Sequence, residues 1–146
     1  MMLPKPSYSK KAKIKKKNTV AYKRKKLEKD NDNLWSEVIK LKAYNKCELC
    51  GNHGSLNSHH IFPRGRMRTR WNLLNGVSLC IQCHMWRGAH STEFEYQKKF
   101  HDWINEYRGV GVLDNLKAES HEAIKRTLQD LEAVNIALKV EKEKYA

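Results

Sequence analysis

The chain has 146 residues, which favours one small domain with extensions over two ordinary domains. Lysine and arginine exceed aspartate and glutamate by 13, and this excess predicts a polyanionic partner. No apolar run reaches the roughly 18 to 20 residues of a transmembrane helix, and no signal-peptide core follows the first lysines, so we expect a soluble intracellular protein with no membrane partner.

The N-terminal segment is strongly basic, because no acidic residue occurs between Met1 and Lys26. Its sequence "SKKAKIKKKNTVAYKRKK" repels itself and has little apolar surface. We expect residues 1–28 to form a basic arm that is disordered unless a partner orders it. Its lysines are expected to contact phosphate, in particular Lys15, Lys16 and Lys17. The alternative is a solubilising tail.

Residues 29–110 are expected to form the folded domain. An apolar stripe between Asp30 and Tyr44 predicts a helix, and residues 47–90 have the composition of a small metal-organised unit. A second helix follows, with a capping box from Thr92 to Glu95 and an end at Gly109. Its aromatic stripe is expected in the core and consists of Tyr96, Phe100, Trp103 and Tyr107.

Residues 111–146 are expected to form an amphipathic helical extension. Ile124, Leu128, Leu131 and Leu138 recur at helical spacing and predict one long helix from about Ser120. The pattern leaves two alternatives open: the helix packs back on the domain, or it pairs with a second copy to give a homodimer.

The four cysteines form two pairs of equal spacing, Cys47 with Cys50 and Cys80 with Cys83. Two C-x-x-C pairs in a chain without a secretion signal indicate a tetrahedral zinc site rather than disulfides. Four thiolates leave no open position on the ion, so this Zn²⁺ is expected to be structural.

The histidines between and after the cysteine pairs are then left for other roles. His59 and His60 are neighbours on what reads as a strand, so their side chains should point to opposite faces. One of them can bind a metal while the other acts as a base, which is the division that phosphodiester hydrolysis needs.

The string "CELCG … HHIFPRG … NLLNGVSLC-x-x-CH" resembles the zinc-stapled HNH endonucleases, most clearly over residues 47–90. More weakly, the flanks resemble small phage-borne HNH and NinG-like recombination nucleases. The resemblance implies a small α+β fold in which a ββα-metal, treble-clef-like core is stapled by a four-cysteine zinc site and flanked by α-helices.

The resemblance also implies a role for each matching residue. His60 matches the general base, and His59 and His84 match the ligands of a catalytic Mg²⁺ or another divalent ion. Asn75 matches the asparagine that braces the loop of the base. His90 is a candidate third ligand, although its spacing from His84 departs from the four-residue step of some members.

A row of arginines lies in the loop between the two halves of this motif. Alternate guanidinium groups suit bidentate contacts to a phosphate backbone, whereas a solvated loop is the plain alternative. The expected nucleic-acid contacts are Arg64, Arg66, Arg68 and Arg70, together with Arg87.

These features lead to the hypothesis of a metal-dependent DNA endonuclease. The competing hypotheses are a non-catalytic zinc-stapled nucleic-acid-binding module and a junction-specific recombination nuclease. The phage resemblance implies phage recombination or packaging proteins as further partners, and the cytoplasm, that of the host for a phage-encoded protein, as the location.

Overall fold

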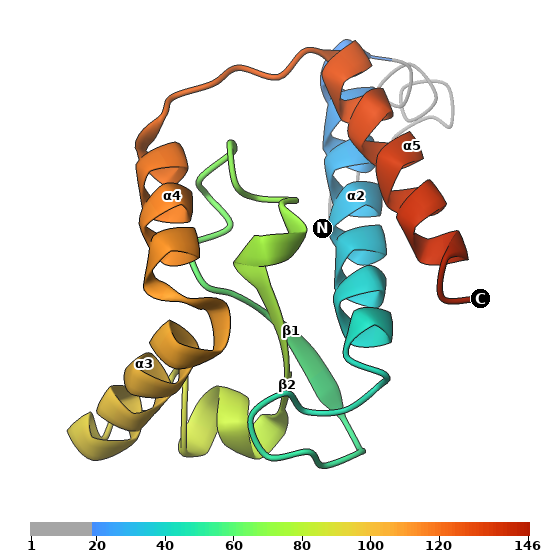
Figure 1. Cartoon of the computed structure of the whole chain (residues 1–146). Helices are drawn as coiled ribbons and strands as arrows, with labels where there is room; N and C mark the ends of the chain where they lie inside the picture. Colours follow the sequence, from blue (N-terminus) through green and yellow to red (C-terminus); the bar gives the residue numbers. More distant parts are fainter. Residues whose placement is uncertain (1–18) are drawn as a thin grey trace, which may run out of the picture.

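The computed structural model describes residues 19–146, and the expected phosphate contacts of Lys15, Lys16 and Lys17 lie outside this range (Figure 1). The described part is a small fold of helices around a two-stranded sheet, which confirms the prediction of a small mixed fold. Its elements are α2 (Val20–Lys42), β1 (Leu56–His60), the 3-10 turn η1 (Leu73–Asn75), β2 (Gly76–Cys80), the wide turn η2 (Gln82–Trp86), α3 (Phe94–Arg108), α4 (Val110–His121) and α5 (Leu128–Glu143).

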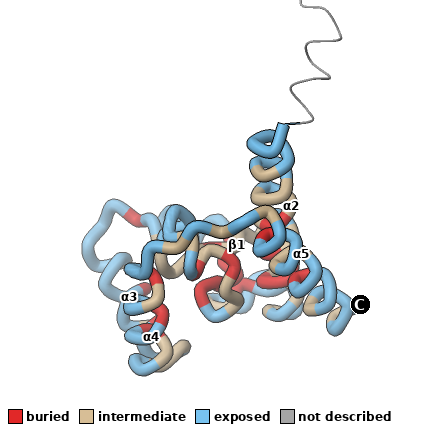
Figure 2. The backbone as a smooth tube through the Cα atoms, turned by 90° about the horizontal axis from the view of Figure 1, so that it is seen from above, coloured by how far each residue is buried: buried red, intermediate tan, exposed pale blue. Residues whose placement is uncertain are grey.

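The sheet lies between two helical layers, with α2 and α5 on one side and α3 and α4 on the other (Figures 1 and 2). Strands β1 and β2 are antiparallel, and the register places His59 opposite Val77 and His60 opposite Gly76. Directly opposite residues share a face of the sheet. The His60 face is covered by α2, and the His59 face is turned toward α3.

Helix α2 starts earlier than expected, because it begins at Val20 rather than near Asp30. Thr19 caps it, and its hydroxyl accepts a hydrogen bond from the backbone amide of Tyr22 at 3.2 Å. Residues 20–28, which we assigned to a disordered arm, are therefore helical. Ion pairs between side chains four residues apart support these turns, and Arg24 with Glu28 at 3.1 Å is one of them.

The start of α3 also differs from the expectation. The helix begins at Phe94, and the cap residue Glu93 makes no side-chain capping bond, so a capping box from Thr92 to Glu95 is wrong. The Ser91 hydroxyl instead accepts the amide of Glu93, the residue before the helix, at 3.2 Å. Of the aromatic stripe, Phe100 is buried as expected, whereas Tyr107 is 47% exposed.

The C-terminal extension is two helices rather than one, because α4 ends at His121 and α5 begins at Leu128. Thr127 and Asp130 form a capping box, in which the Thr127 hydroxyl accepts the Asp130 amide at 3.1 Å and the Asp130 carboxylate accepts the Thr127 amide at 2.6 Å. The capping box thus starts a new helix within the apolar repeat, although the spacing of the apolar residues is that of one continuous helix.

Helix α5 packs back on α2, and the two helices run in the same direction (Figure 1). Leu131 and Leu138 are buried against Trp35 and Ile39 of α2. The buried amide of Asn31 donates to the carbonyl of Leu131 at 3.0 Å. Of the two alternatives for the C-terminal extension, the structure therefore shows packing on the same chain. A homodimer through α5 would have to use its opposite, exposed face.

None of the helices in the described range combines the length and the apolar character that crossing a membrane requires.

Candidate metal centre and active site

The four cysteines lie together at one end of the sheet. Cys47 and Cys50 come from a tight turn that precedes β1, in which Gly51 adopts a φ of 77° and donates its amide to the carbonyl of Cys47 at 2.8 Å. Cys80 ends β2 and Cys83 lies in η2. The clustering predicted from the two equal spacings is thus confirmed.

The sulfur geometry fits a tetrahedral ion. The Sγ atoms of Cys50 and Cys80 are 3.7 Å apart, and all four cysteines are free thiols. A zinc ion with bonds of about 2.3 Å to four sulfurs requires sulfur separations of about 3.8 Å. A disulfide, in contrast, has a bond of about 2.05 Å. The cluster can therefore hold a metal ion such as zinc.

Backbone groups also prepare this site for thiolates. Burial opposes ionisation of Cys47, but amides of Cys80, Cys50 and Leu49 directed at its sulfur lower the pKa of this thiol overall. Burial raises the pKa of Cys83, and its cysteine neighbours raise it further. A divalent cation bound between the four sulfurs would cancel the effect of the neighbouring cysteines on this pKa, because it compensates the negative charge of the thiolates.

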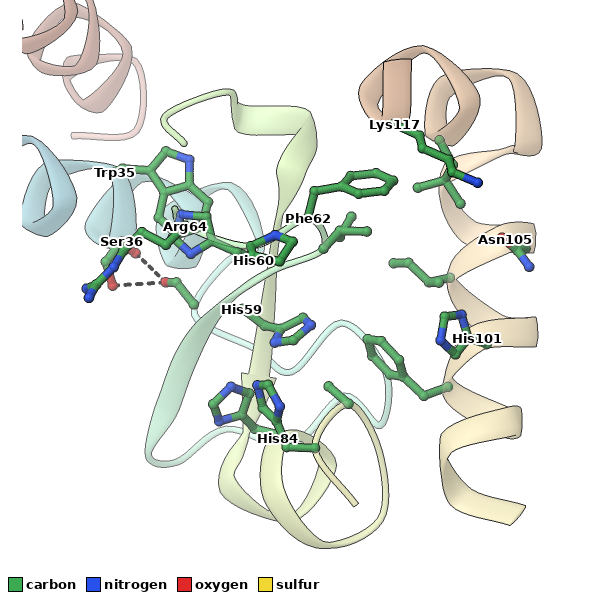
Figure 3. A pocket seen from close by; sticks show the side chains of 18 of the residues that line it. Trp35, Ser36, His59, His60, Phe62, Arg64, His84, His101, Asn105 and Lys117 are labelled. Atoms are coloured by element: carbon green, nitrogen blue, oxygen red, sulfur yellow. Dashed lines mark hydrogen bonds between the residues drawn. The ribbon is translucent and has the colours of Figure 1, made fainter. Parts of the chain in front are cut away.

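A second cluster consists of three histidines, His59, His84 and His90, whose nearest ring nitrogens all lie within 4.8 Å of one another. His59 comes from β1 and is 9% exposed, and Figure 3 shows its ring near that of His84. The ring centroid of His59 is 5.4 Å from that of His84 and 4.9 Å from that of His90. Burial, together with the neighbouring imidazoles of His90 and His84, lowers the pKa of His59 to about 3. The ring is thus neutral near pH 7 and keeps a lone pair for a metal.

These three imidazoles suit one transition-metal ion. Ring nitrogens that share an ion at about 2.1 Å lie about 3.0 to 3.4 Å apart, and the separations of at most 4.8 Å found here are close to that range. The chemistry of the donor set, three neutral nitrogens and no carboxylate, fits Zn²⁺, Ni²⁺, Co²⁺ or Mn²⁺ better than Mg²⁺.

The wide turn η2 explains how His90 reaches this cluster in spite of its six-residue spacing from His84. The amide of Arg87 donates to the carbonyl of Gln82 at 2.8 Å, and the amide of His90 donates to the carbonyl of His84 at 2.9 Å. These steps of five and six residues replace the four-residue step of a regular helix. Gly88 permits the turn, because a Cβ there would collide with the carbonyl oxygen of Cys83.

His60 lies on the opposite face of β1 and belongs to neither cluster. Its ring stacks on Trp35 at a centroid distance of 3.9 Å, and its Nε2 donates to the backbone carbonyl of Arg70 at 2.9 Å. A carbonyl can only accept, so Nε2 carries the proton and Nδ1 has a free lone pair. Burial lowers the pKa of His60 below its ordinary value of 6.5, which favours this neutral form.

Asn75 is fully buried and holds the loop that follows β1. Its Oδ1 accepts the amide of Phe62 at 2.7 Å, and its Nδ2 donates to the carbonyls of Phe62 at 3.0 Å and Thr69 at 3.1 Å. Every hydrogen-bonding group of the amide side chain except one lone pair is thus used within the loop. Asn75 thus connects Phe62 to Thr69 across the loop.

The three-histidine cluster and the separate His60 line one cavity of about 960 Å³. Its walls come from α2 on one side and from α3 and α4 on the other (Figure 3). Sequence patterns gave no signal for these wall residues, because tertiary packing alone brings them to the histidines. They include Asp32, Ser36, His101, Asn105 and Lys117.

The expected arginine contacts divide into exposed and paired groups. Arg64 lines the cavity with 66% of its side chain exposed, and Arg66 and Arg87 are exposed too. Arg68 is 3.4 Å from Glu122 in a surface ion pair. Arg70 differs from our expectation: its guanidinium is 15% exposed and forms a bidentate pair with Asp32, so it is engaged within the protein rather than presented to a phosphate.

Comparison of the chain with protein-family models, with curated proteins and with solved structures finds no match.

Proposed function

We propose that the chain is a metal-dependent endonuclease of the HNH kind that hydrolyses phosphodiester bonds in DNA. The observation that carries the proposal is the divergence of two neighbours on β1 that line one cavity. His59 joins the cluster of His84 and His90, whereas His60 stands apart with a bare Nδ1. A metal site beside an unligated imidazole base is what phosphodiester hydrolysis requires.

In this proposal His60 accepts a proton from the attacking water at Nδ1. The hydrogen bond from Nε2 to the Arg70 carbonyl keeps the ring in the tautomer that can do so. The carbonyl also stabilises the imidazolium that forms. Asn75 contributes indirectly, because it ties Phe62 to Thr69 and so holds the loop between His60 and Arg70.

The three-histidine cluster would hold the catalytic divalent ion. When bound, such an ion polarises the scissile phosphate and stabilises the leaving oxygen. Three protein ligands leave coordination positions for phosphate oxygens and water. The four-cysteine site has no such vacancy, so its proposed role is to hold the turn before β1 against β2 and η2.

Two cationic side chains on different walls of the cavity are proposed to contact the phosphates that flank the scissile one. Arg64 follows β1, and Lys117 projects from α4 on the other side (Figure 3). The net charge of +13 supports a polyanionic substrate. Neither feature selects duplex over branched DNA, so a junction-specific recombination nuclease is the narrower form of the same proposal.

The test compares wild-type protein with His60→Ala and with His121→Ala, which alters an exposed histidine that does not line the cavity. Each is incubated with supercoiled plasmid and with a four-way junction in the presence of Mg²⁺, Mn²⁺, Ni²⁺ or chelator. We expect metal-dependent cutting by wild type and His121→Ala, and a loss of roughly 100- to 10,000-fold in His60→Ala. If wild type binds both substrates but cuts neither, the non-catalytic binding module replaces the nuclease.

A further inference from the structure

One turn of α2 holds the segment that carries the backbone partner of His60. Asp32 accepts three hydrogen bonds from this segment: Nε of Arg70 at 2.9 Å and Nε1 of Trp71 at 2.9 Å reach Oδ1, and Nη2 of Arg70 at 2.7 Å reaches Oδ2. The Asp32 side chain is 19% exposed, so these bonds are largely shielded from water.

The same Arg70 provides the carbonyl oxygen to which His60 donates at 2.9 Å. The side chains of Arg70 and Trp71 both donate to the carboxylate of Asp32. The orientation of the peptide that contains the carbonyl therefore depends on Asp32. Three residues further along α2, Trp35 stacks on the ring of His60 and donates its Nε1 to the carbonyl of Asn72 at 3.1 Å. One turn of α2 thus contacts the face of the His60 ring through Trp35 and fixes the acceptor of its Nε2 through Asp32.

We propose that Asp32 is a positioning residue that holds His60, through Arg70 and Trp71, in the tautomer with a bare Nδ1. The inference rests on the proposed function, in which that nitrogen is the base. Asp32 itself is not available as a metal ligand or as a base. Both of its oxygens already accept charged or indole donors, and Arg64 adds a cation 3.9 Å away.

Loss of the carboxylate should free the Arg70 carbonyl without touching the metal ligands. In Asp32→Asn one oxygen becomes an amide nitrogen, which cannot accept from Arg70, so the bidentate pair is broken. The ring of His60 then loses its fixed acceptor and samples both tautomers. A general base in the wrong tautomer cannot take the proton, and a reacting group displaced by about 1 Å can cost roughly 100-fold in rate.

The experiment uses the full chain with zinc at the cysteine site and compares wild type with Asp32→Asn. Asp30→Asn is the matched control, because Asp30 lies on the same helix with 42% of its side chain exposed and pairs with Lys26 at 2.8 Å rather than with the segment of Arg70. Long-range proton–nitrogen NMR correlations report which ring nitrogen of His60 is protonated, with the assignment made from His60→Gln. The kinetic readout separates kcat from KM on a short DNA substrate.

We expect one protonated and one bare ring nitrogen in wild type and Asp30→Asn, and averaged nitrogens in Asp32→Asn. We also expect kcat to fall roughly 100-fold in Asp32→Asn while KM changes less than about twofold. A purely structural role would lower the melting temperature without mixing the tautomers. Unchanged tautomer and kcat in a folded Asp32→Asn would overturn the inference.

Two further outcomes are informative. If Asp32→Asn does not fold, Arg70→Lys replaces it, since lysine keeps the charge but lacks the planar fork, and the same NMR and kinetic changes are expected. A wild-type tautomer and kcat in Arg70→Lys would then reject the inference. If wild type does not cleave DNA with any metal, the proposed function fails, whereas the NMR comparison still decides whether Asp32 orients His60.

Discussion

The rings of Trp35 and His60 are stacked, with their centroids 3.9 Å apart and an angle of 12° between their planes. Trp35 belongs to α2 and His60 to β1, and the register explains how the helix comes so close. The partner of His60 on β2 is Gly76, which has no side chain on the face that α2 covers. The absence of a Cβ at this point therefore determines the environment of the proposed base.

Gly76→Ala should disturb this stack. A Cβ at Gly76 would lie 2.6 Å from Cζ2 of Trp35 and also overlap the side chain of Ile39, so α2 must move away from the sheet. Overpacking of this kind typically costs about 1 to 3 kcal/mol of the free energy of unfolding. Urea unfolding measures that loss. The proposed DNA cleavage should also become slower, because the ring of His60 is displaced. Gly65→Ala is the control, because a Cβ there meets nothing within 4 Å, and equal stabilities of the two variants would contradict the close approach.

The local parts of the site could be predicted from the sequence. Equal C-x-x-C spacings indicate a four-cysteine cluster because two ligands with two residues between them can reach one ion. The opposite directions of His59 and His60 follow from the alternation of a strand. Each C-x-x-C pair and the two neighbouring histidines are short local patterns, and the structure confirms both geometries.

The parts that depend on tertiary packing could not be predicted. Asp32 and Trp35 lie more than twenty residues before His60 in the sequence, and only the docking of α2 on the sheet brings them to it. The prediction that Arg70 contacts nucleic acid was wrong, because the sequence of a basic loop does not indicate whether an arginine faces solvent or pairs with a carboxylate. The break between α4 and α5 was missed because the apolar spacing continues through Thr127.

His90→Ala should weaken the second metal site as much as His84→Ala, although the six-residue spacing of the two histidines does not suggest a shared ion. Both rings contact His59 and each other, with 4.8 Å between the centroids of His84 and His90. We expect Ni²⁺ affinity, measured by calorimetry, to fall at least about tenfold in either variant. His101→Ala is the matched control from the cavity wall. Unchanged affinity in His90→Ala would reduce the site to two histidines.

Cys50→Ser should release the proposed structural zinc and destabilise the domain, even though Cys50 is the exposed member of the cluster. The free energy of binding a structural metal is largely folding free energy, so a lost ligand costs stability directly. Mass spectrometry under native conditions should show one zinc fewer, and circular dichroism should show a lower melting temperature. His84→Ala should keep that zinc, because it belongs to the other cluster. A fully stable, zinc-free Cys50→Ser protein would contradict the proposed stapling role.

Leu131→Ala should destabilise the fold by about 2 to 5 kcal/mol, since Leu131 is completely buried between α5 and α2. Ile136→Ala, on the same helix but 63% exposed, should change stability by less than about 0.5 kcal/mol. Denaturant unfolding measures both. If Ile136→Ala changes the oligomeric state in sedimentation velocity, the exposed face of α5 is a dimer interface after all.

Arg64→Ala and Lys117→Ala should each weaken DNA binding in a salt-dependent way. The two side chains line the same cavity from different walls, and the Arg64 side chain is 66% exposed and comes no closer than 3.9 Å to the carboxylate of Asp32. Each phosphate contact that is lost should make the slope of log affinity against log salt shallower by about one. Fluorescence anisotropy with a short duplex, without divalent ions to prevent cleavage, measures this slope. Lys139→Ala removes an exposed lysine of α5 outside the cavity and should leave the slope unchanged. If all three variants weaken binding equally, net charge rather than the cavity attracts the DNA, and the assignment of Arg64 and Lys117 to the flanking phosphates is wrong.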